Sequence, residues 1–240
     1  VKVATSFTSI DNARKNLACE IPGWDFNEVR QTSSDTWNQT LGQIAVKGNN
    51  EEEKVKFYSA LYNAHFLPRT FSDVDGSYPK FDGGGQIMKM DHGTYYCDFS
   101  QWDTYRAVHP LFSILNPSRN GDMAHSLVLK GQQGGWLPIF PSWNSYTAAM
   151  IGDHCIAMIG DAIIKDVPGF DYEEAYTLMR KNAFEANPDS GSYRDGKGRR
   201  AMESYLKYNY VPLEDQVMEA FHRREQVSRT LEYAYDDFVL

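Results

Sequence analysis

The sequence has few cysteines, no long hydrophobic run and no excess of positive charge. Three cysteines occur in 240 residues, namely Cys19, Cys97 and Cys155. An odd number at wide, unpatterned spacing argues against a disulfide framework and against a cysteine-based zinc site. The longest apolar stretch, residues 148–164, is interrupted by two aspartates and a histidine. We therefore predict no membrane-spanning helix.

The shortage of positive charge restricts the class of partner. Lysine and arginine number 24 against 32 acidic residues, which gives a formal net charge of −8. Binding to nucleic acid needs a basic face. The nearest basic cluster, residues 194–200, contains Asp195 and lies among glycines, so we interpret it as a solvated loop. No nucleic-acid partner is expected.

What the sequence does contain is a large apolar and aromatic fraction. Hydrophobic residues make up 42% and aromatic residues 14%, including 15 tyrosines and 5 tryptophans. This composition supports a sizeable core and excludes global disorder. Tryptophan and tyrosine in loops also suit sugar binding, because their faces stack on C–H surfaces.

Helical periodicity with capping and stop signals dominates the chain and predicts a mainly α fold. The predicted helices are residues 9–17, 25–44, 51–66, 101–115, 120–130, 145–164, 172–187 and 227 onward, with a short strand at 1–7, an ordered loop at 70–93 and a polar loop at 187–198. Helices joined by Gly/Pro/aromatic loops are typical of an α/α toroid. The chain begins at Val1 rather than methionine, and Leu240 follows helical sequence without a stop signal, so we expect both ends to be cut.

Residues 99–106, Phe-Ser-Gln-Trp-Asp-Thr-Tyr-Arg, are the most informative stretch. They place an indole, a carboxylate and a guanidinium within five positions, at Trp102, Asp103 and Arg106. A carboxylate accepts hydroxyl hydrogen bonds from a sugar, and an indole stacks on its C–H surface. Arg106 would share a helix face with Asp103 and fix its rotamer. The alternative is structural: an acid in the first turn of a helix that Ser100 caps.

A second stretch rich in glycine, proline and aromatic residues runs from 134 to 150. Trp136, close to Pro138, either packs in the core or faces a ligand, and the sequence pattern does not decide between these two interpretations. Trp143, Asn144 and Tyr146 stand at the start of a predicted helix, and we expect them to line a cleft. A proline-braced loop loses little entropy when it binds a ligand.

Two further polar groups lie in helical sequence. Asp153 and His154 are in an apolar run, and we interpret them as a buried polar pair that needs partners. Glu232 and Asp236 would share one helix face, which is unfavourable unless a cation lies between them. His154 has no second histidine at metal-ligand spacing. The turn at residues 73–78 lacks the later ligands of a calcium loop, so no metal ligand is assigned.

Taken together, the segments resemble glycoside hydrolase family 92, the calcium-dependent exo-acting α-mannosidases. The matching motifs run in family order: Ser-Ile-Asp-Asn-Ala-Arg-Lys-Asn-Leu at 9–17, Glu-Ile-Pro-Gly-Trp-Asp-Phe at 20–26, Phe-Tyr-Ser-Ala-Leu-Tyr at 57–62, Asp-Val-Asp-Gly at 73–76, Trp-Asp-Thr-Tyr-Arg at 102–106, Gly-Trp-Leu-Pro at 135–138 and Ser-Arg-Thr-Leu-Glu-Tyr-Ala at 228–234. The resemblance covers nearly the whole chain.

The resemblance implies an N-terminal β-sandwich, a helical linker and an (α/α)6 catalytic domain. Residues 1–8 would then be the end of the β-sandwich domain and contain its last strand. Residues 9–49 would form the helical linker, and residues 50–240 the first, incomplete part of the toroid.

The resemblance also implies removal of terminal α-linked mannose with inversion, which uses an acid and a base on either side of the bond. In the family the acid, the base and much of the calcium shell lie in more C-terminal motifs, which have no counterpart here. We therefore assign no catalytic residue and expect the acid and the base beyond Leu240.

What the resemblance carries over is the substrate-binding role of Asp103. The residues expected to line the pocket with it are Trp102, Arg106, Trp143, Asn144 and Tyr146. The implied cofactor is Ca2+, with ligands outside this segment, and the implied partner is a mannose-containing oligosaccharide or glycan. The implied location is secreted, periplasmic or at the cell surface.

The sequence departs from the family at two positions. Many members have Glu-Thr where this chain has Tyr146-Thr147, and tryptophan where it has Phe140. A tyrosine in place of glutamate removes a charge and would add a stacking surface, so α-1,2 linkage specificity does not follow from the resemblance.

Two other functions stay open. One is a non-catalytic carbohydrate-binding or pseudo-enzyme segment, and the other is another toroid enzyme such as a polysaccharide lyase, which the acidic balance disfavours.

Overall fold

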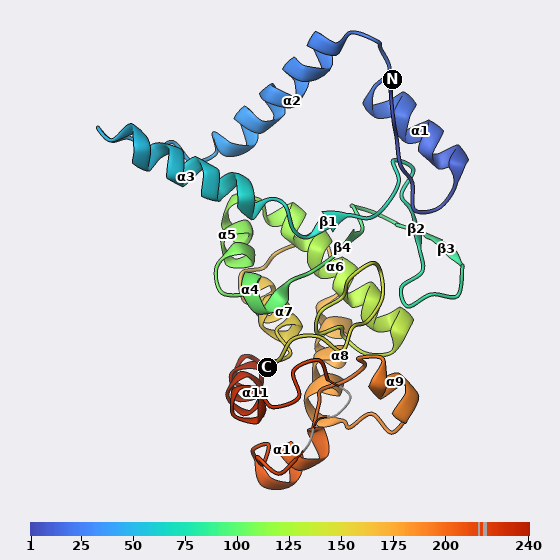
Figure 1. Ribbon diagram of the computed structural model, residues 1–240, viewed down its shortest axis with the longest axis vertical. Coiled ribbons are helices and arrows are strands. Elements are labelled where there is room, and N and C mark those ends of the chain that lie inside the picture. Colours follow the sequence, from blue (N-terminus) through green and yellow to red (C-terminus); the bar gives the residue numbers. More distant parts are fainter. Residues whose placement is uncertain (216, 218–219) are drawn as a thin grey trace.

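Helices make up most of the regular structure, as the sequence predicts (Figure 1). The computed structural model describes residues 1–215, 217 and 220–240. In chain order the elements are α1 (Ile10–Glu20), α2 (Phe26–Leu41), α3 (Glu51–Ala64), β1 (Arg69–Thr70), β2 (Ser77–Pro79), β3 (Ile87–Lys89), β4 (Tyr96–Cys97), α4 (Gln101–Thr104), α5 (Val108–Leu115), α6 (Pro117–Gly134), α7 (Cys155–Ile164), α8 (Tyr172–Phe184), α9 (Ser190–Arg194), α10 (Met202–Tyr208) and α11 (Gln226–Val239). The mainly α class is confirmed.

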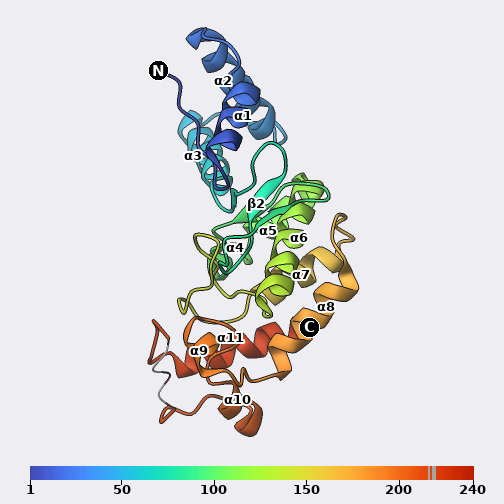
Figure 2. The same ribbon diagram turned by 90° about the vertical axis from the view of Figure 1, so that its right-hand side faces the viewer.

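Helices α1 to α3 form an open arm that projects from the rest of the chain (Figures 1 and 2). Ser9, Asp25 and Asn50 cap them by accepting hydrogen bonds from backbone N–H groups two or three residues on. Three glutamates at 51–53 follow Asn50 at the positive end of the α3 dipole. Helix α2 buries no residue and α3 buries only Leu61, so the arm has little core of its own.

The main hydrophobic core lies between α5, α6, α7 and α8. Helix α7 is apolar on nearly every face and is almost entirely buried. A Cβ added at Gly131 of α6 would lie 2.8 Å from Cδ1 of Leu178 on α8, so these two helices approach closely. The side chains that fill the core include Phe112, Met123, Leu127, Ile156, Ile159, Leu178 and Met179. This packing of successive helices is consistent with part of an α/α toroid.

The predicted loop at 70–93 is ordered and contains two small antiparallel pairs of strands. Strand β1 pairs with β4, and β2 forms a hairpin with β3 in which Tyr78 is opposite Met88. Phe71, Tyr78 and Tyr95 turn inward and form a second, smaller apolar cluster. The rings of Tyr78 and Tyr95 are stacked with centroids 4.0 Å apart.

Several predicted elements differ from the structure. The helix expected at 101–115 is divided into α4 and α5, because Pro110 lies in the first turn of α5, where its missing N–H is tolerated. The helix expected at 145–164 begins only at Cys155, since Met150 and Gly152 have φ of 66° and 79°. Helix α9 lies within the predicted loop at 187–198, and α10 was not predicted.

The N-terminal segment, residues 1–8, carries no assigned strand, so the strand expected at 1–7 is not formed in the described chain. A strand requires a hydrogen-bonded neighbour, and no described strand pairs with this segment. The division into 1–8, 9–49 and 50–240 stays a prediction. Among the described residues, no helix combines the length and apolarity that crossing a membrane would require.

Asp73 fastens α1 and the segment before it to the turn after β1. The side chain of Asp73 is buried, and its Oδ2 accepts hydrogen bonds from Ser6 at 2.8 Å and from Thr8. The amide of Asn16 donates to Oδ1 at 2.8 Å, and that of Asn12 to Oδ2 at 3.2 Å. Burial would raise the pKa of Asp73, but these four hydrogen bonds outweigh it and the pKa is lowered. The turn is therefore structural, as interpreted from the sequence.

We expect Asp73→Asn to weaken the attachment of α1 by about 1–3 kcal/mol, because a charged acceptor of four hydrogen bonds is lost. Hydrogen-exchange protection of α1 measures this change. Because the folded pKa of Asp73 lies below its unfolded value of about 3.9, its stabilisation is present above about pH 4 and is lost as the pH falls through the folded pKa. The control is Asp11→Asn, because Asp11 lies on α1 itself but its side chain is exposed. Equal protection in the two variants at neutral pH would contradict the assignment.

Candidate functional site

Asp103 is presented to solvent by α4, which is a single turn of helix. The hydroxyl of Ser100 donates a hydrogen bond to Asp103 Oδ2, and the backbone N of Asp103 donates to Ser100 O at 3.0 Å. No further hydrogen bond to its carboxylate is found among the described residues, and the side chain is exposed. Ser100 therefore fixes the rotamer of Asp103 and leaves one carboxylate oxygen available to a ligand.

Arg106 does not contact Asp103, contrary to the expectation from their spacing. Helix α4 ends at Thr104, so the two side chains do not share a helix face. The guanidinium of Arg106 instead lies 3.5 Å from Glu232 Oε1 of α11 and stacks over the ring of Trp102 at 4.9 Å. Trp102 Nε1 donates to the same Glu232 oxygen at 3.1 Å. Glu232 thus holds both side chains.

His154 lies between the two carboxylates of α11. Its Nδ1 is 2.9 Å from Asp236 Oδ1, and its Nε2 is 3.0 Å from Glu232 Oε2. The second contact is an ion-pair distance without hydrogen-bond alignment. The ring of Tyr105 stacks on the imidazole with centroids 4.1 Å apart. The imidazole therefore separates the two carboxylates on α11, and Arg106 supplies a cation beside Glu232.

Asp153 extends this arrangement into a buried network. Its backbone N donates to Asp236 Oδ2 at 2.7 Å, and its own carboxylate accepts from Asn182 and from Arg199 Nε at 3.0 Å. Arg199 also donates to Asp237 Oδ1 at 2.6 Å. Asp153 and His154 are thus a buried polar pair with polar partners, as predicted, although His154 Nε2 has no aligned hydrogen bond.

Burial shifts the pKa of two carboxyl groups in this network. It raises the pKa of Asp153 and of Asp236 above the ordinary carboxyl value, while Arg199 opposes the shift in both. Both side chains are fully buried, so neither presents an oxygen to solvent. The network can hold α11 against the loop before α7, but it offers no surface to a ligand.

Of the three residues predicted at the second stretch, Trp143 alone is exposed, at 71%. Its backbone N donates to Asp98 Oδ1 at 2.7 Å, and its backbone is left-handed, with a φ of 51°. The guanidinium of Arg69 lies over its ring at 5.4 Å from the centroid. Asp98 also accepts a hydrogen bond from Arg69 Nε at 2.9 Å. One carboxylate therefore positions both Trp143 and the guanidinium that lies over its ring.

Asn144 and Tyr146 are buried and face the protein rather than a cleft. Asn144 donates to Pro79 O at 2.7 Å and accepts from Tyr95 at 2.8 Å. The Tyr146 hydroxyl donates to Trp136 O, and burial raises its pKa. Tyr146 therefore adds no exposed stacking surface, contrary to the expectation from the sequence. Its role in this chain is to brace the loop.

The two stretches singled out from the sequence lie together just before α4. The backbone N of Phe99 donates to Pro141 O at 3.2 Å, and Asp98 beside it binds the backbone of Trp143. Trp136 is buried at 7% exposure, so its interpretation as a core residue is the one that the structure supports. Trp102, Asp103, Arg106 and Trp143 are the predicted residues that keep exposed or partly exposed side chains.

Arg199 and Arg200 are the residues that sequence reasoning missed. The basic cluster at 194–200 was interpreted as a solvated loop, yet both arginines are buried, at 1% and 3% exposure. Paired acids at Asp236 and Asp237 in the last helix were the available signal, because buried carboxylates need a cation. No local pattern links the two segments.

The match to known proteins is extensive. The model of the glycosyl hydrolase family 92 catalytic domain matches residues 12–240. The chain belongs to glycoside hydrolase family 92. No curated protein sequence matches it.

Solved structures of family 92 enzymes superpose on nearly all of the chain. A family 92 α-mannosidase from Bacteroides thetaiotaomicron has 34% identity and a TM-score of 0.83, covering 98% of this chain and 29% of that one. Its complex with mannoimidazole gives a TM-score of 0.84 at 34% identity, covering 98% of this chain and 28% of that one. A family 92 inverting mannosidase from Bacteroides thetaiotaomicron VPI-5482 has 30% identity and a TM-score of 0.83, covering 97% and 30%. The chain thus spans less than a third of the length of these family 92 proteins.

We expect Arg199→Leu to destabilise this domain by about 3–5 kcal/mol, because removing the guanidinium leaves the buried carboxylate of Asp153 without its cation. The midpoint of denaturant unfolding measures the loss. The matched control is Arg194→Leu, since Arg194 is exposed on α9. Similar midpoints for the two variants would show that the network contributes little to stability.

Proposed function

We propose that this chain contributes the substrate-binding side of the active site of an inverting α-mannosidase. The enzyme removes terminal α-linked mannose from glycans. Membership of family 92 and the mannosidases among its neighbours support this function. The observation that carries the residue assignment is the state of Asp103. Its rotamer is fixed by Ser100, its side chain is exposed, and one of its oxygens is free for a ligand.

In the proposed complex, Asp103 accepts hydrogen bonds from hydroxyls of the terminal mannose. Trp102 offers an indole whose N–H is already held by Glu232, so binding costs little side-chain entropy. Arg106 and Trp143 add a polar and an aromatic side chain to the edge of the proposed sugar-binding site. Asn144 and Tyr146 act through the loop that they brace and do not contact the sugar.

Inversion requires a general acid and a general base with room for a water between them. We assign neither to this chain. The close carboxylates Asp153 and Asp236 are buried and paired with Arg199 and His154. We therefore expect the acid and the base C-terminal to Leu240, and the residues of this chain to bind and orient the sugar.

The calcium ion of the family does not fit the residues described in this chain. Calcium takes six to eight oxygen ligands. Within residues 1–215, 217 and 220–240, the one three-residue group with converging metal-ligand atoms contains two histidines. We propose that the calcium ligands lie elsewhere in the enzyme, and we derive no step through the ion. A secreted, periplasmic or cell-surface location also stays a proposal.

We expect Asp103→Ala in the intact enzyme to lower kcat/KM for an aryl α-mannoside by the equivalent of about 2–5 kcal/mol, because a charged hydrogen bond to the substrate is lost. Initial-rate kinetics measure the effect. The matched control is Asp35→Ala on α2, where the aspartate is exposed and far along the arm. Near wild-type kcat/KM for the Asp103 variant would reject its assigned role.

A second candidate function is carbohydrate binding without catalysis, favoured by the burial of the close carboxylates described above. Calorimetry with mannobiose and a turnover assay on the intact protein distinguish the two, since binding without turnover would support the second. We also expect the 240-residue chain alone to hydrolyse no aryl α-mannoside. Measurable hydrolysis by this chain would refute our placing of the acid and the base.

A further inference from the structure

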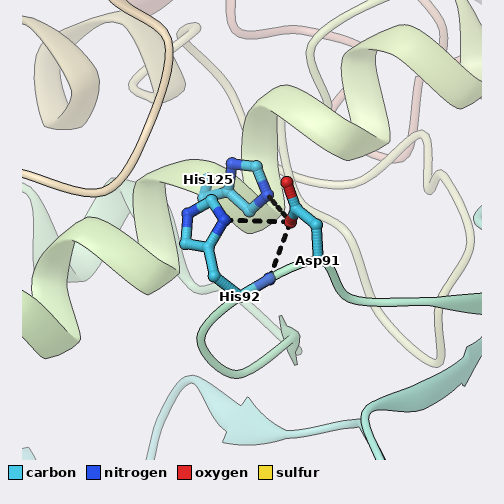
Figure 3. A group of neighbouring side chains, drawn as sticks. All are labelled: Asp91, His92 and His125. Atoms are coloured by element: carbon cyan, nitrogen blue, oxygen red, sulfur yellow. Dashed lines mark hydrogen bonds and ion pairs between the residues drawn. The ribbon is translucent and has the colours of Figure 1, made fainter.

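A separate group of side chains converges where the loop between β3 and β4 crosses α6 (Figure 3). Asp91 and His92 come from the loop, and His125 comes from the middle of α6. One ligand atom from each residue lies within 4.8 Å of the other two. Asp91 Oδ1 is 3.0 Å from His92 Nδ1 and 3.5 Å from a nitrogen of His125. None of these residues belongs to the network around Glu232.

We propose that Asp91, His92 and His125 form a binding site for a divalent transition metal, with Zn2+ as the preferred ion. The proposal is independent of the sugar-binding function. It rests on the hydrogen bonding of His92, the unpartnered nitrogens of His125 and the spacing of the three ligand atoms.

The hydrogen bonding of His92 fixes the tautomer that a metal needs. Its Nε2 lies 3.0 Å from the carbonyl oxygen of Gly169. A carbonyl oxygen can only accept, so Nε2 carries the hydrogen and Nδ1 of the neutral ring carries the lone pair. Nδ1 faces Asp91 Oδ1 at 3.0 Å, so either a proton or a metal ion can bridge the two atoms. A backbone carbonyl on the far nitrogen is the usual support of a metal-bound histidine.

His125 supplies the second imidazole. Neither of its ring nitrogens has a hydrogen-bond partner in the described chain, although both atoms are shielded from solvent. Leaving such groups unpaired is unfavourable. The rings of His92 and His125 lie with centroids 4.7 Å apart and share the one carboxylate of Asp91. A metal ion would satisfy both imidazoles and the carboxylate at once.

The spacing suits a small ion bound by nitrogen and oxygen. In a tetrahedral zinc site with bonds of about 2.0–2.2 Å, neighbouring ligand atoms are about 3.3–3.5 Å apart. The distances of 3.0 and 3.5 Å to Asp91 Oδ1 are close to this spacing, and the ligand nitrogens of the two histidines lie within 4.8 Å of each other. Two imidazoles with one carboxylate favour zinc and similar metals over calcium or magnesium. Three protein ligands leave the fourth position to water.

The fold holds the loop firmly enough to define the group. The carboxylate of Asp122, one turn before His125 on α6, accepts from the backbone N of Thr94 at 3.0 Å. A Cβ at Gly93 would lie only 2.1 Å from Asp122 Oδ1, so the loop rests directly on the helix there. A bound ion would join the loop, α6 and, through His92, the segment at Gly169.

The test is a titration of the intact, metal-stripped protein, free of any histidine tag, with Zn2+ alone in the presence of excess Ca2+. We expect one Zn2+ site by calorimetry. His92→Ala and His125→Ala should each weaken it by at least about 10–100-fold, since even changes around a ligand have that effect. Tetrahedral absorption of Co2+ at the same site is an independent signature of the ligand set. The control is His222→Ala, which removes a histidine outside the group and should leave affinity unchanged.

The Asp91→Asn variant removes a ligand without disturbing the fold, because the side chain of Asp91 is 73% exposed and its replacement leaves the packing intact. Weaker Zn2+ binding and loss of the tetrahedral Co2+ spectrum in this folded variant would support the site. Zn2+ should also raise the Tm of the wild-type protein but not of the ligand variants. No Zn2+ binding by the wild type, or equal affinity in the wild type and all three variants, would overturn the proposal.

Discussion

The contact on which the candidate site depends is His154 held between Asp236 and Glu232. Two carboxylates one turn apart on α11 repel each other unless positive charge lies between them. The imidazole of His154 lies between them and ties the segment before α7 to the last helix, and the guanidinium of Arg106 lies 3.5 Å from Glu232. Glu232, positioned in this way, receives the indole N–H of Trp102 and the guanidinium of Arg106. Trp102 and Arg106 are thus oriented by Glu232, which lies against the buried imidazole of His154.

Local chemistry explains which parts of the fold were predictable. The starts of α1, α2 and α3 follow from Ser9, Asp25 and Asn50, whose side chains accept hydrogen bonds within their own turn. The helix at 145–164 was predicted too long, because its early residues adopt left-handed backbone at Met150, which no local pattern signals. Tertiary packing overrides apolar periodicity at such positions.

The candidate site was predicted to a similar extent. Asp103 and Trp143 are predicted because their residue types and neighbours suit a sugar, and the structure leaves both side chains exposed. The buried partners of the network depend on contacts across long sequence separations, such as that between Arg199 and Asp237. A basic cluster among glycines has the same local appearance whether it is solvated or buried. Only the fold distinguishes the two cases.

The arginines beside Trp102 and Trp143 have a consequence for how a ligand can approach. An indole has two faces, and the guanidinium of Arg106 covers one face of Trp102 while Arg69 covers one face of Trp143. Each ring is therefore a one-sided platform. In the proposed complex a sugar would stack on the face opposite the guanidinium, so the two arginines would set its side of approach.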